Sequence, residues 1–290
     1  MNDNNFPLVS VLMGAYNEEA RLKDTIDSIL SQTYTNFEFV IVDDGSKDGT
    51  AEILRRYATN DRRIVIVKNP QNIGLTKSLN RGLEQVKGEF VARIDAGDIS
   101  HLDRLTKQVE YLLNNENISI VGTNAYWINS KKEIIGICRF PLKPSDVKNR
   151  LYGQTSIALH PSLMIRTQLF KAMGPFNALN PTSIEYELYF RTIYNGYNIA
   201  NLPEYLMFIL RDDKGISVER IKREFIEQYK LRVKYLPHFF NLSNIFNTVL
   251  SVIFIIIPSA LLKKIVDIRI HWSVTGHPKQ VTHGQGKIGH

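Results

Sequence analysis

Residues 37–50 read FEFVIVDDGSKDGT, a short apolar run that ends in two carboxylates, a glycine and a serine. A run of this length, rich in Val, Ile and Phe and closed by turn residues, predicts a buried strand and a tight turn. Similar runs occupy residues 8–16, 63–69 and 89–96, and apolar residues at helical spacing lie between them. This alternation predicts βαβ units, which build a mostly parallel sheet with helices on both faces.

Polar segments stand where these predicted strands end. AYNEE follows the first run, DDGSKDGT the second and DAGD the fourth. Each segment alone is ordinary turn chemistry, but ligands of such sheets bind at the carboxyl ends of the strands. The shared position therefore predicts a binding site. The sequence contains no GxGxxG or GxxxxGK[ST] loop, which argues against a dehydrogenase and a P-loop enzyme.

The composition changes beyond about residue 215. Residues 218–237 predict a basic helix, and residues 245–262 contain no charged side chain. A run of 18 residues is close to the length that spans a bilayer. A span, a helix lying in the membrane interface and a buried or subunit-interface helix all stay open. We therefore divide the chain into a catalytic domain (1–215), a basic and apolar helical extension (216–274) and a flexible tail (275–290).

Charge and cysteine content restrict the partners and the compartment. The net charge of +7 and the pI near 9.3 favour anionic partners. Lys and Arg concentrate beside the apolar run, which favours an anionic membrane surface bound through residues 220–270 over nucleic acid. The single cysteine, Cys138, excludes an internal disulfide, and residues 1–7 lack the features of a secretory signal. We expect the cytoplasmic face of the cell membrane, with peripheral or single-anchor attachment.

Six segments in order resemble glycosyltransferase family 2, the inverting sugar-nucleotide transferases with a GT-A fold. The resemblance extends from about Pro7 to Asp213. It is carried by VSVLMGAYNEE, SILSQTYTNFEFVIVDDGSKDGT, NPQNIGLTKSLNRGL, GEFVARIDAGDISHLDRL, HPSLMIR and EYELYFRTIYNGYNIANLPE. It implies an α/β GT-A fold, a nucleotide-sugar donor (a UDP-sugar foremost), a glycan or lipid-linked acceptor, and direct displacement without a protein nucleophile.

The resemblance also implies roles for individual residues. Tyr16 is expected near the base of the donor, Glu18 near its ribose, and Asp44 in a pair with the base. Asp95 matches the first carboxylate of the DXD motif, which binds the ribose and a divalent metal, Mn²⁺ or Mg²⁺. Glu185, in IEYELY, falls at the position of the general base. Such a base must come within hydrogen-bond reach of the acceptor hydroxyl.

The chain departs from the family pattern at three places. Gly97 stands where the second carboxylate of the DXD motif is usual, so Asp98 is the candidate for a second metal ligand. Ile184 replaces the leading Glu of the base motif. The chain reads LRDD where YRxH is usual, so Asp213 replaces a histidine, and Arg211 is expected to offset the charge of the diphosphate.

These features leave several functions open. The first is an inverting glycosyltransferase in cell-surface polysaccharide synthesis. The departures also fit a degenerate relative that binds nucleotide or scaffolds an assembly complex without turnover. A nucleotidyltransferase is less favoured, because the glycine-rich, basic N-terminal loop of such enzymes is absent. For His160 a packing role is favoured over ligation, and a homo-oligomer is compatible with an apolar C-terminal interface.

Overall fold

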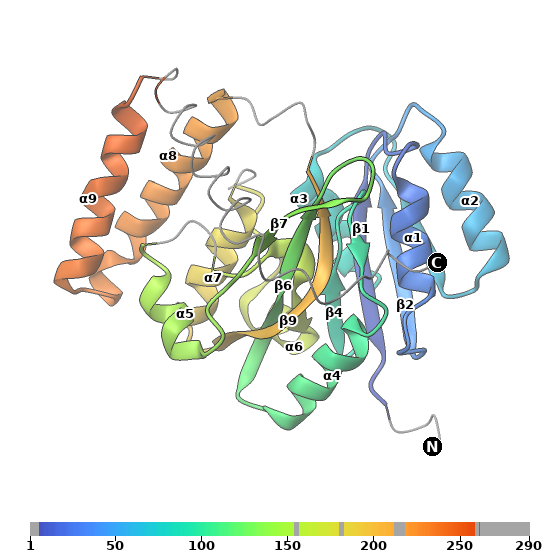
Figure 1. Cartoon of the computed structure of the whole chain (residues 1–290), viewed down its shortest axis with the longest axis horizontal. Helices are drawn as coiled ribbons and strands as arrows, with labels where there is room; N and C mark the ends of the chain where they lie inside the picture. The colour runs from blue at the N-terminus through green and yellow to red at the C-terminus, as the bar shows by residue number, and fades with distance from the viewer. Residues whose placement is uncertain (1–5, 154–156, 180–182, 212–217, 259–260, 262–290) are drawn as a thin grey trace.

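The computed structural model describes residues 6–153, 157–179, 183–211, 218–258 and 261. One sheet runs through its centre, in the strand order β3-β2-β1-β4-β8-β6-β9-β5, and β7 pairs with β6 (Figure 1). The strands are β1 (Val9–Ala15), β2 (Phe37–Asp43), β3 (Ile64–Lys68), β4 (Phe90–Arg93), β5 (Ile99–Ser100), β6 (Ile118–Ile128), β7 (Ile134–Cys138), β8 (Met164–Arg166) and β9 (Asn198–Leu210). The helices are α1 (Leu22–Leu30), α2 (Thr50–Asn60), α3 (Leu75–Leu83), α4 (Arg104–Asn114), α5 (Pro144–Arg150), α6 (Thr167–Met173), α7 (Ile184–Tyr194), α8 (Val218–Tyr235) and α9 (Leu242–Ile256).

The first half of the sheet confirms the predicted βαβ units. β1 pairs in parallel with β2 and β4, and β2 pairs in parallel with β3. The second half is mixed: β8 is antiparallel to β4 and β6, and β5 is antiparallel to β9, whereas β6 and β9 are parallel. The expectation of a mostly parallel sheet thus holds for the first half. The antiparallel neighbours come from distant segments, so hydrophobic periodicity could not reveal them.

Two apolar clusters cover the two faces of the sheet, because successive side chains of a strand point to opposite faces. Val11 packs in one cluster with Ile26 of α1 and residues of α4. Leu12 packs in the other with Leu79 of α3 and Leu188 of α7. With both faces covered, the carboxyl ends of the strands are left as the open edge where ligand-binding loops can gather.

Helices α8 and α9 form a pair at one end of the molecule (Figure 1). Tyr235 of α8 stacks on Phe190 of α7 at a centroid distance of 5.1 Å, and the Arg232 Nε donates to the Tyr186 hydroxyl at 2.9 Å. The extension is therefore packed on the α/β domain. No helix in the described ranges combines the length and the apolar character that crossing a bilayer requires. The predicted tail (275–290) and Asp213 lie outside the described residues.

Candidate active site

The loop after β1 is fastened to the loop after β2. The Asn17 N–H donates to Ser46 Oγ at 3.1 Å, and the Glu18 N–H donates to Thr50 Oγ1 at 2.8 Å. Asn17 has a φ of +56°, a left-handed conformation that asparagine tolerates. This turn leaves the Tyr16 ring exposed at the carboxyl edge of the sheet. The two loops meet as the sequence predicted.

Asp44, the first residue after β2, is buried and binds the loop before α3. Its Oδ1 accepts from Asn69 Nδ2 at 2.7 Å and from the Ile73 N–H at 2.9 Å, and its Oδ2 accepts from the Gly74 N–H at 2.9 Å. A carboxylate offers about four acceptor positions, so these bonds use most of them. Asp44 thus fixes the shape of the predicted base-binding edge. Its own contact with a base stays a prediction.

Asp95 follows β4 and is held by a buried guanidinium. Arg93 is fully buried, and its Nη1 donates to the Leu12 carbonyl at 2.9 Å. The Arg93 Nη2 donates to Asp95 Oδ1 at 2.5 Å. The Asp95 side chain is nevertheless 38% exposed. The result is a carboxylate that is fixed in position by a cation beneath it and still open to a ligand.

A second buried guanidinium supports the first. The Arg104 Nη2 donates to the Arg93 carbonyl at 2.6 Å, and its Nε donates to Gln108 Oε1 at 3.0 Å. Burial and the charge of Arg93 lower the pKa of Arg104 to about 9, while Asp98 opposes that shift. Neither arginine was among the site residues predicted from the sequence. The available signal was a charged residue, Arg93, inside the otherwise apolar run FVARI.

Asp98 anchors the DAGD loop to the last strand. It is buried, and its Oδ1 accepts from the Leu210 N–H at 3.1 Å, which places Arg211 next to this loop. Burial, together with the charge of Asp95, raises the pKa of Asp98 well above its usual range. Asp98 is only 6% exposed, and its side chain is bonded to the backbone of β9, so little of its carboxylate is open to a cation. The geometry therefore favours loop support for Asp98, and metal ligation by it stays a prediction.

Gly97 has a backbone conformation that suits glycine. Its φ is +98°, and its N–H donates to Thr25 Oγ1 at 2.9 Å. L side chains rarely adopt such a φ. The departure from the DXD pattern is thus accompanied by a loop conformation that disfavours a carboxylate-bearing residue at this position.

The donor set of the loop limits how a metal could bind. Among the residues that the structure describes, no group of three His, Cys, Asp or Glu side chains could hold a metal ion. Asp95 offers an exposed carboxylate. Mg²⁺ commonly binds one or two carboxylates and takes other ligands from substrate phosphates and water. The residues present therefore fit a divalent ion that the donor itself largely coordinates, and they do not fit a closed protein cage.

His160 lies buried near Asp95 and Arg93. Its ring packs edge-on against Phe176 at a centroid distance of 5.8 Å, which agrees with the expected packing role. Burial, followed by the charge of Arg93, lowers the pKa of His160 to about 3, and Asp95 opposes this shift. The imidazole is therefore neutral at physiological pH. Its Nε2 has no hydrogen-bond partner within the described structure.

Helix α7 presents its two acids differently. Glu187 is buried and pairs with Arg191 at 3.1 Å, so it stabilises the helix. Glu185 lies in the first turn and is only partly buried. Burial, followed by the charge of Glu185, raises the pKa of Tyr189. The Tyr189 hydroxyl donates to the Ala158 carbonyl at 3.0 Å. Glu185 is thus the more accessible of the two acids, as a base requires.

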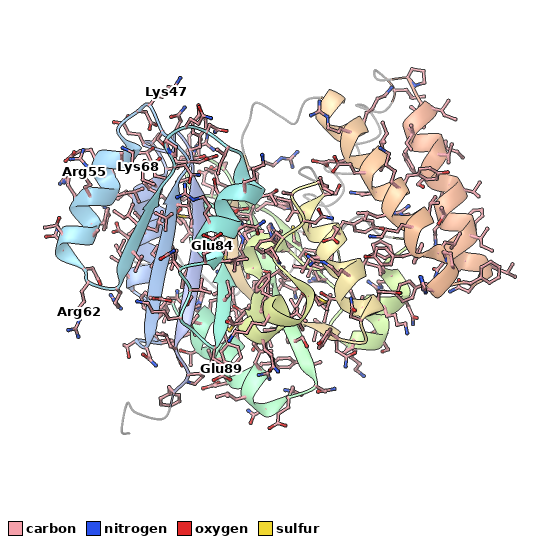
Figure 2. The ribbon with its side chains drawn as sticks, turned by 180° about the vertical axis from the view of Figure 1, so that it is seen from behind. Lys47, Arg55, Arg62, Lys68, Glu84 and Glu89 are labelled. Atoms are coloured by element: carbon pink, nitrogen blue, oxygen red, sulfur yellow. The ribbon has the colours of Figure 1, made fainter. Side chains whose placement is uncertain are left out.

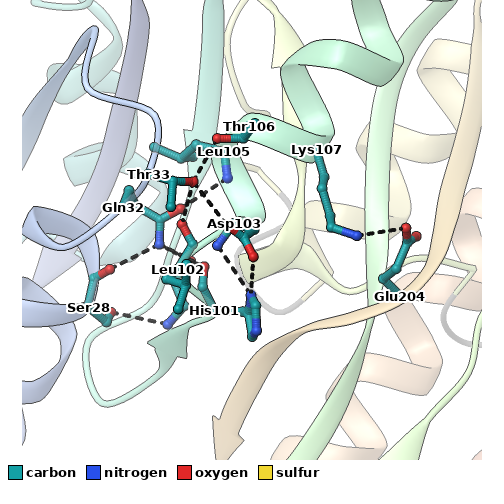
Figure 3. Close-up of polar contacts among 11 residues, drawn as sticks. Ser28, Gln32, Thr33, His101, Leu102, Asp103, Leu105, Thr106, Lys107 and Glu204 are labelled. Atoms are coloured by element: carbon teal, nitrogen blue, oxygen red, sulfur yellow. Dashed lines mark hydrogen bonds and ion pairs between the residues drawn. The ribbon is translucent and has the colours of Figure 1, made fainter. Parts of the chain in front are cut away.

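A polar network fixes the segment that follows the DAGD loop (Figure 3). The Gln32 Nε2 donates to the His101 carbonyl at 2.8 Å, and its Oε1 accepts from the Leu105 N–H at 3.0 Å. The Ser100 N–H donates to Ser28 Oγ at 3.1 Å. These bonds tie α1 to β5 and to the start of α4. They hold the segment after the DAGD loop in place, and none of these residues is among the predicted site residues.

Comparison with known proteins identifies relatives along most of the chain. Residues 10–174 match the family model of glycosyl transferase family 2. An uncharacterized glycosyltransferase of Methanocaldococcus jannaschii is 31% identical over 279 residues, which cover 91% of this chain and 94% of the relative. The O-antigen biosynthesis glycosyltransferase WbnJ of Escherichia coli is 32% identical over 230 residues, which cover 78% of this chain and 88% of WbnJ.

Solved structures share the fold. S. aureus TarS 1–349 in complex with UDP-GlcNAc has a TM-score of 0.62 at 20% identity and covers 79% of this chain, which spans 66% of that chain. The mannosyltransferase PcManGT from Pyrobaculum calidifontis, in complex with GDP-Man and Mn²⁺, has a TM-score of 0.61 at 19% identity, over 92% of this chain and 81% of that chain. These likenesses confirm the expected GT-A architecture. The family-model match over residues 10–174 and the Methanocaldococcus jannaschii relative show that the chain belongs to glycosyl transferase family 2.

Proposed function

We propose that the chain moves a sugar from a nucleotide diphosphate donor to a glycan or lipid-linked acceptor, with inversion, in cell-surface polysaccharide synthesis. The observation that carries the proposal is Asp95, an exposed carboxylate fixed by the buried Arg93 at the edge where the loops after β1 and β2 meet. The similarity to WbnJ, which is named for O-antigen biosynthesis, supports the pathway class.

A UDP-sugar is the first donor to test. TarS was solved with UDP-GlcNAc and PcManGT with GDP-Man, so both nucleotide classes occur among proteins of this fold. In the proposed complex Tyr16 packs on the base, Asp44 shapes the pocket that receives it, and Glu18 lies near the ribose. Asp95 meets the ribose and the diphosphate side of the donor.

The proposed chemistry is a single displacement. Glu185 accepts the proton of the acceptor hydroxyl, and that oxygen forms a bond to the anomeric carbon as the bond to the diphosphate oxygen breaks on the opposite face. Arg211, which follows the Asp98-anchored end of β9, offsets the charge of the departing diphosphate. A divalent ion, Mn²⁺ or Mg²⁺, when bound at Asp95, would supply further positive charge there.

We place this reaction at the cytoplasmic face of the membrane. The basic and apolar helices α8 and α9 pack on the domain through Tyr235 and Arg232, so a membrane-bound extension would hold the site near a lipid-linked acceptor. Cys138 is partly buried, and burial raises the pKa of its thiol to about 12, which suits a packed and unreactive side chain.

A nucleotide-binding scaffold without turnover is the second candidate. One observation favours it: the φ of +98° at Gly97 and the burial of Asp98 leave Asp95 as the exposed carboxylate of the DAGD loop. With less help for the leaving diphosphate, binding could persist without chemistry. This candidate predicts donor binding with no release of nucleoside diphosphate.

Release of nucleoside diphosphate from UDP-, GDP- and dTDP-sugars, with and without Mn²⁺, tests these proposals. We expect turnover with one nucleotide class, and we expect Glu185→Gln to lower it at least about 100-fold, because a glutamine cannot accept the proton. Glu187→Gln on the same helix is the control; it should lower stability while it retains most of the turnover of the folded protein. Binding without turnover supports the scaffold, and absence of both binding and turnover contradicts both candidates.

A further inference from the structure

The two buried side chains of helix α9 are polar, whereas several of its apolar side chains are exposed. Thr248 and Ser251 are buried on the side that faces the rest of the protein. Their hydroxyls are satisfied within the helix, because Thr248 Oγ1 donates to the Asn244 carbonyl at 2.7 Å and Ser251 Oγ donates to the Thr248 carbonyl at 2.5 Å. Burial therefore leaves no polar group of these two side chains unpaired. The most buried positions of this helix thus carry hydroxyl groups, whereas an ordinary surface helix buries apolar side chains.

The exposed apolar side chains form one continuous stripe. They follow a spacing of four and three residues, which places them on the same face of the helix. Their exposed fractions range from 51% for Ile253 to 85% for Leu242. We call this set the α9 stripe: Leu242, Phe246, Val249, Ile253 and Ile256. A contiguous apolar surface of this kind marks a binding face.

Cations lie on the helices next to the stripe. Lys148 of α5 is exposed, and together with Phe240, Asn241 and Ser243 it lines a hollow at the start of α9. Lys230 and Lys234 of α8 are exposed as well. The stretch 236–258, which includes α9, contains no Lys, Arg, Asp or Glu. Helices α5, α8 and α9 gather at one end of the molecule (Figure 1). These helices carry the uncharged apolar stripe and the exposed lysines.

Two kinds of occupant could cover the stripe. A second copy, paired through a two-fold axis, would bring the same surface against itself and would therefore offer the lysines of one copy a surface that carries lysines of its own. An anionic bilayer satisfies both features, because its acyl region receives the apolar side chains and its headgroups pair with lysine. The charge pattern therefore favours the bilayer.

We propose that α9 lies in the plane of an anionic bilayer, with the α9 stripe inserted and with Lys148 directed at the headgroups. This inference deepens the proposed membrane location and needs no catalytic activity. In this proposal the chain is attached to the membrane by one defined face of α9 and not by a membrane-spanning helix. The proposal also predicts which side chains carry the attachment.

Vesicle flotation of the full chain, without donor, tests this proposal. We expect the chain to float with vesicles of phosphatidylcholine and about 30% phosphatidylglycerol, and to float less in high salt or with phosphatidylcholine alone. Phe246→Asn combined with Ile253→Asn should weaken partitioning at least about tenfold, since two large apolar side chains no longer insert. Lys148→Gln should weaken it roughly fivefold at low salt. Leu242→Asn is a second, single variant at the most exposed stripe position.

Matched controls lie away from the stripe. Leu179→Asn changes a highly exposed leucine on the loop after α6, and Arg62→Gln removes a cation at the end of the molecule opposite α8 and α9 (Figure 2). Both should float like the wild type. The proposal would be overturned if the stripe variants floated as well as the wild type. It would also be overturned if the chain formed a dimer in solution that the double variant dissociates, while neither the wild type nor any variant bound vesicles. A chain that floats but lacks turnover contradicts the proposed function alone.

Discussion

Two regions of this molecule, the candidate active site and helix α9, depart from the usual pattern of burial in opposite directions. At the candidate active site, ionisable side chains are buried: Arg93 and Arg104 are fully enclosed, and Asp98 is nearly so. At α9, apolar side chains such as Phe246 are exposed while Ser251 is buried. The guanidinium groups of Arg93 and Arg104 donate to backbone carbonyls and to side-chain oxygens, and these bonds fix the local arrangement. The apolar side chains of the α9 stripe are exposed among the described residues, and we propose that a bilayer covers them.

The difference teaches that the two surfaces have different energetic roles. Burying an ion without partners is costly, so the arginines of the active site must be retained together with their acceptors. The α9 stripe contributes little to folding, because its side chains are exposed in the folded chain. Mutations of the buried arginines should therefore change the stability of the fold, and mutations in the α9 stripe should change binding.

The largest expected effect is that of Arg104→Met. The substitution removes the donors to the Arg93 carbonyl and to Gln108 Oε1, and it takes away one of the two buried guanidinium charges that act on Asp98. We expect the free energy of unfolding to fall by about 3–5 kcal/mol, as when one partner of a buried ionic network is lost. Urea denaturation measures it. Arg62→Met, at an exposed arginine, should change stability by less than about 0.5 kcal/mol, and an equal effect of both would contradict the comparison.

His160 should make stability depend on pH. Burial lowers its pKa to about 3, whereas an unfolded histidine titrates near 6.5. The native state therefore favours the neutral ring, and this stability is complete above pH 6.5 and is lost as the pH falls toward 3. Between pH 7.5 and pH 5 the wild type should lose about 2 kcal/mol more than His160→Gln. Denaturation at the two pH values measures the difference, and identical losses would refute a neutral buried imidazole.

Gly97→Asp restores the residue type that the family pattern expects, but it does so at a φ of +98°. An added Cβ would lie 3.4 Å from Arg21 Cδ, so space is available and backbone strain dominates. We expect a loss of about 1–2 kcal/mol of stability. Gly97→Ala carries the same strain without the carboxylate. If Mn²⁺ raises the unfolding midpoint of the Asp variant more than that of the Ala variant, a second metal ligand has been restored; equal midpoint shifts would show that this loop does not place the new carboxylate near the ion.

Local patterns predicted much of this arrangement, and distant pairings explain what they missed. The run FEFVIVDD predicted β2 and the position of Asp44, because a strand and its turn depend on neighbouring residues. Nothing local shows that Asp44 binds Asn69 or that Asp98 binds the Leu210 N–H, since these partners are brought together by the sheet. Comparison of DAGD with the DXD motif identified Gly97 as a departure from the family pattern, but it could not reveal the positive φ of this residue.

The C-terminal run illustrates the opposite problem. Residues 245–262 are uncharged, so their composition alone could not separate a span, an interfacial helix and a core helix. The structure ends α9 at Ile256, two residues before Pro258, and packs it on α8 through Phe225 and Phe254. Which face is exposed depends on that packing. Only the folded structure could therefore show that Thr248 and Ser251 are buried while the α9 stripe is exposed.

The smallest expected effect is that of Phe246→Ser on stability. Phenylalanine to serine in a core would cost several kcal/mol, but this ring is 65% exposed, so the folded state loses few contacts. We expect the free energy of unfolding in vesicle-free buffer to change by less than about 0.5 kcal/mol. Phe190→Ser, at a fully buried ring that stacks on Tyr235, is the matched comparison and should cost at least about 3 kcal/mol. A large decrease in the free energy of unfolding of Phe246→Ser would mean that the α9 stripe is covered in solution. The contrast between the candidate active site and α9 would then no longer hold.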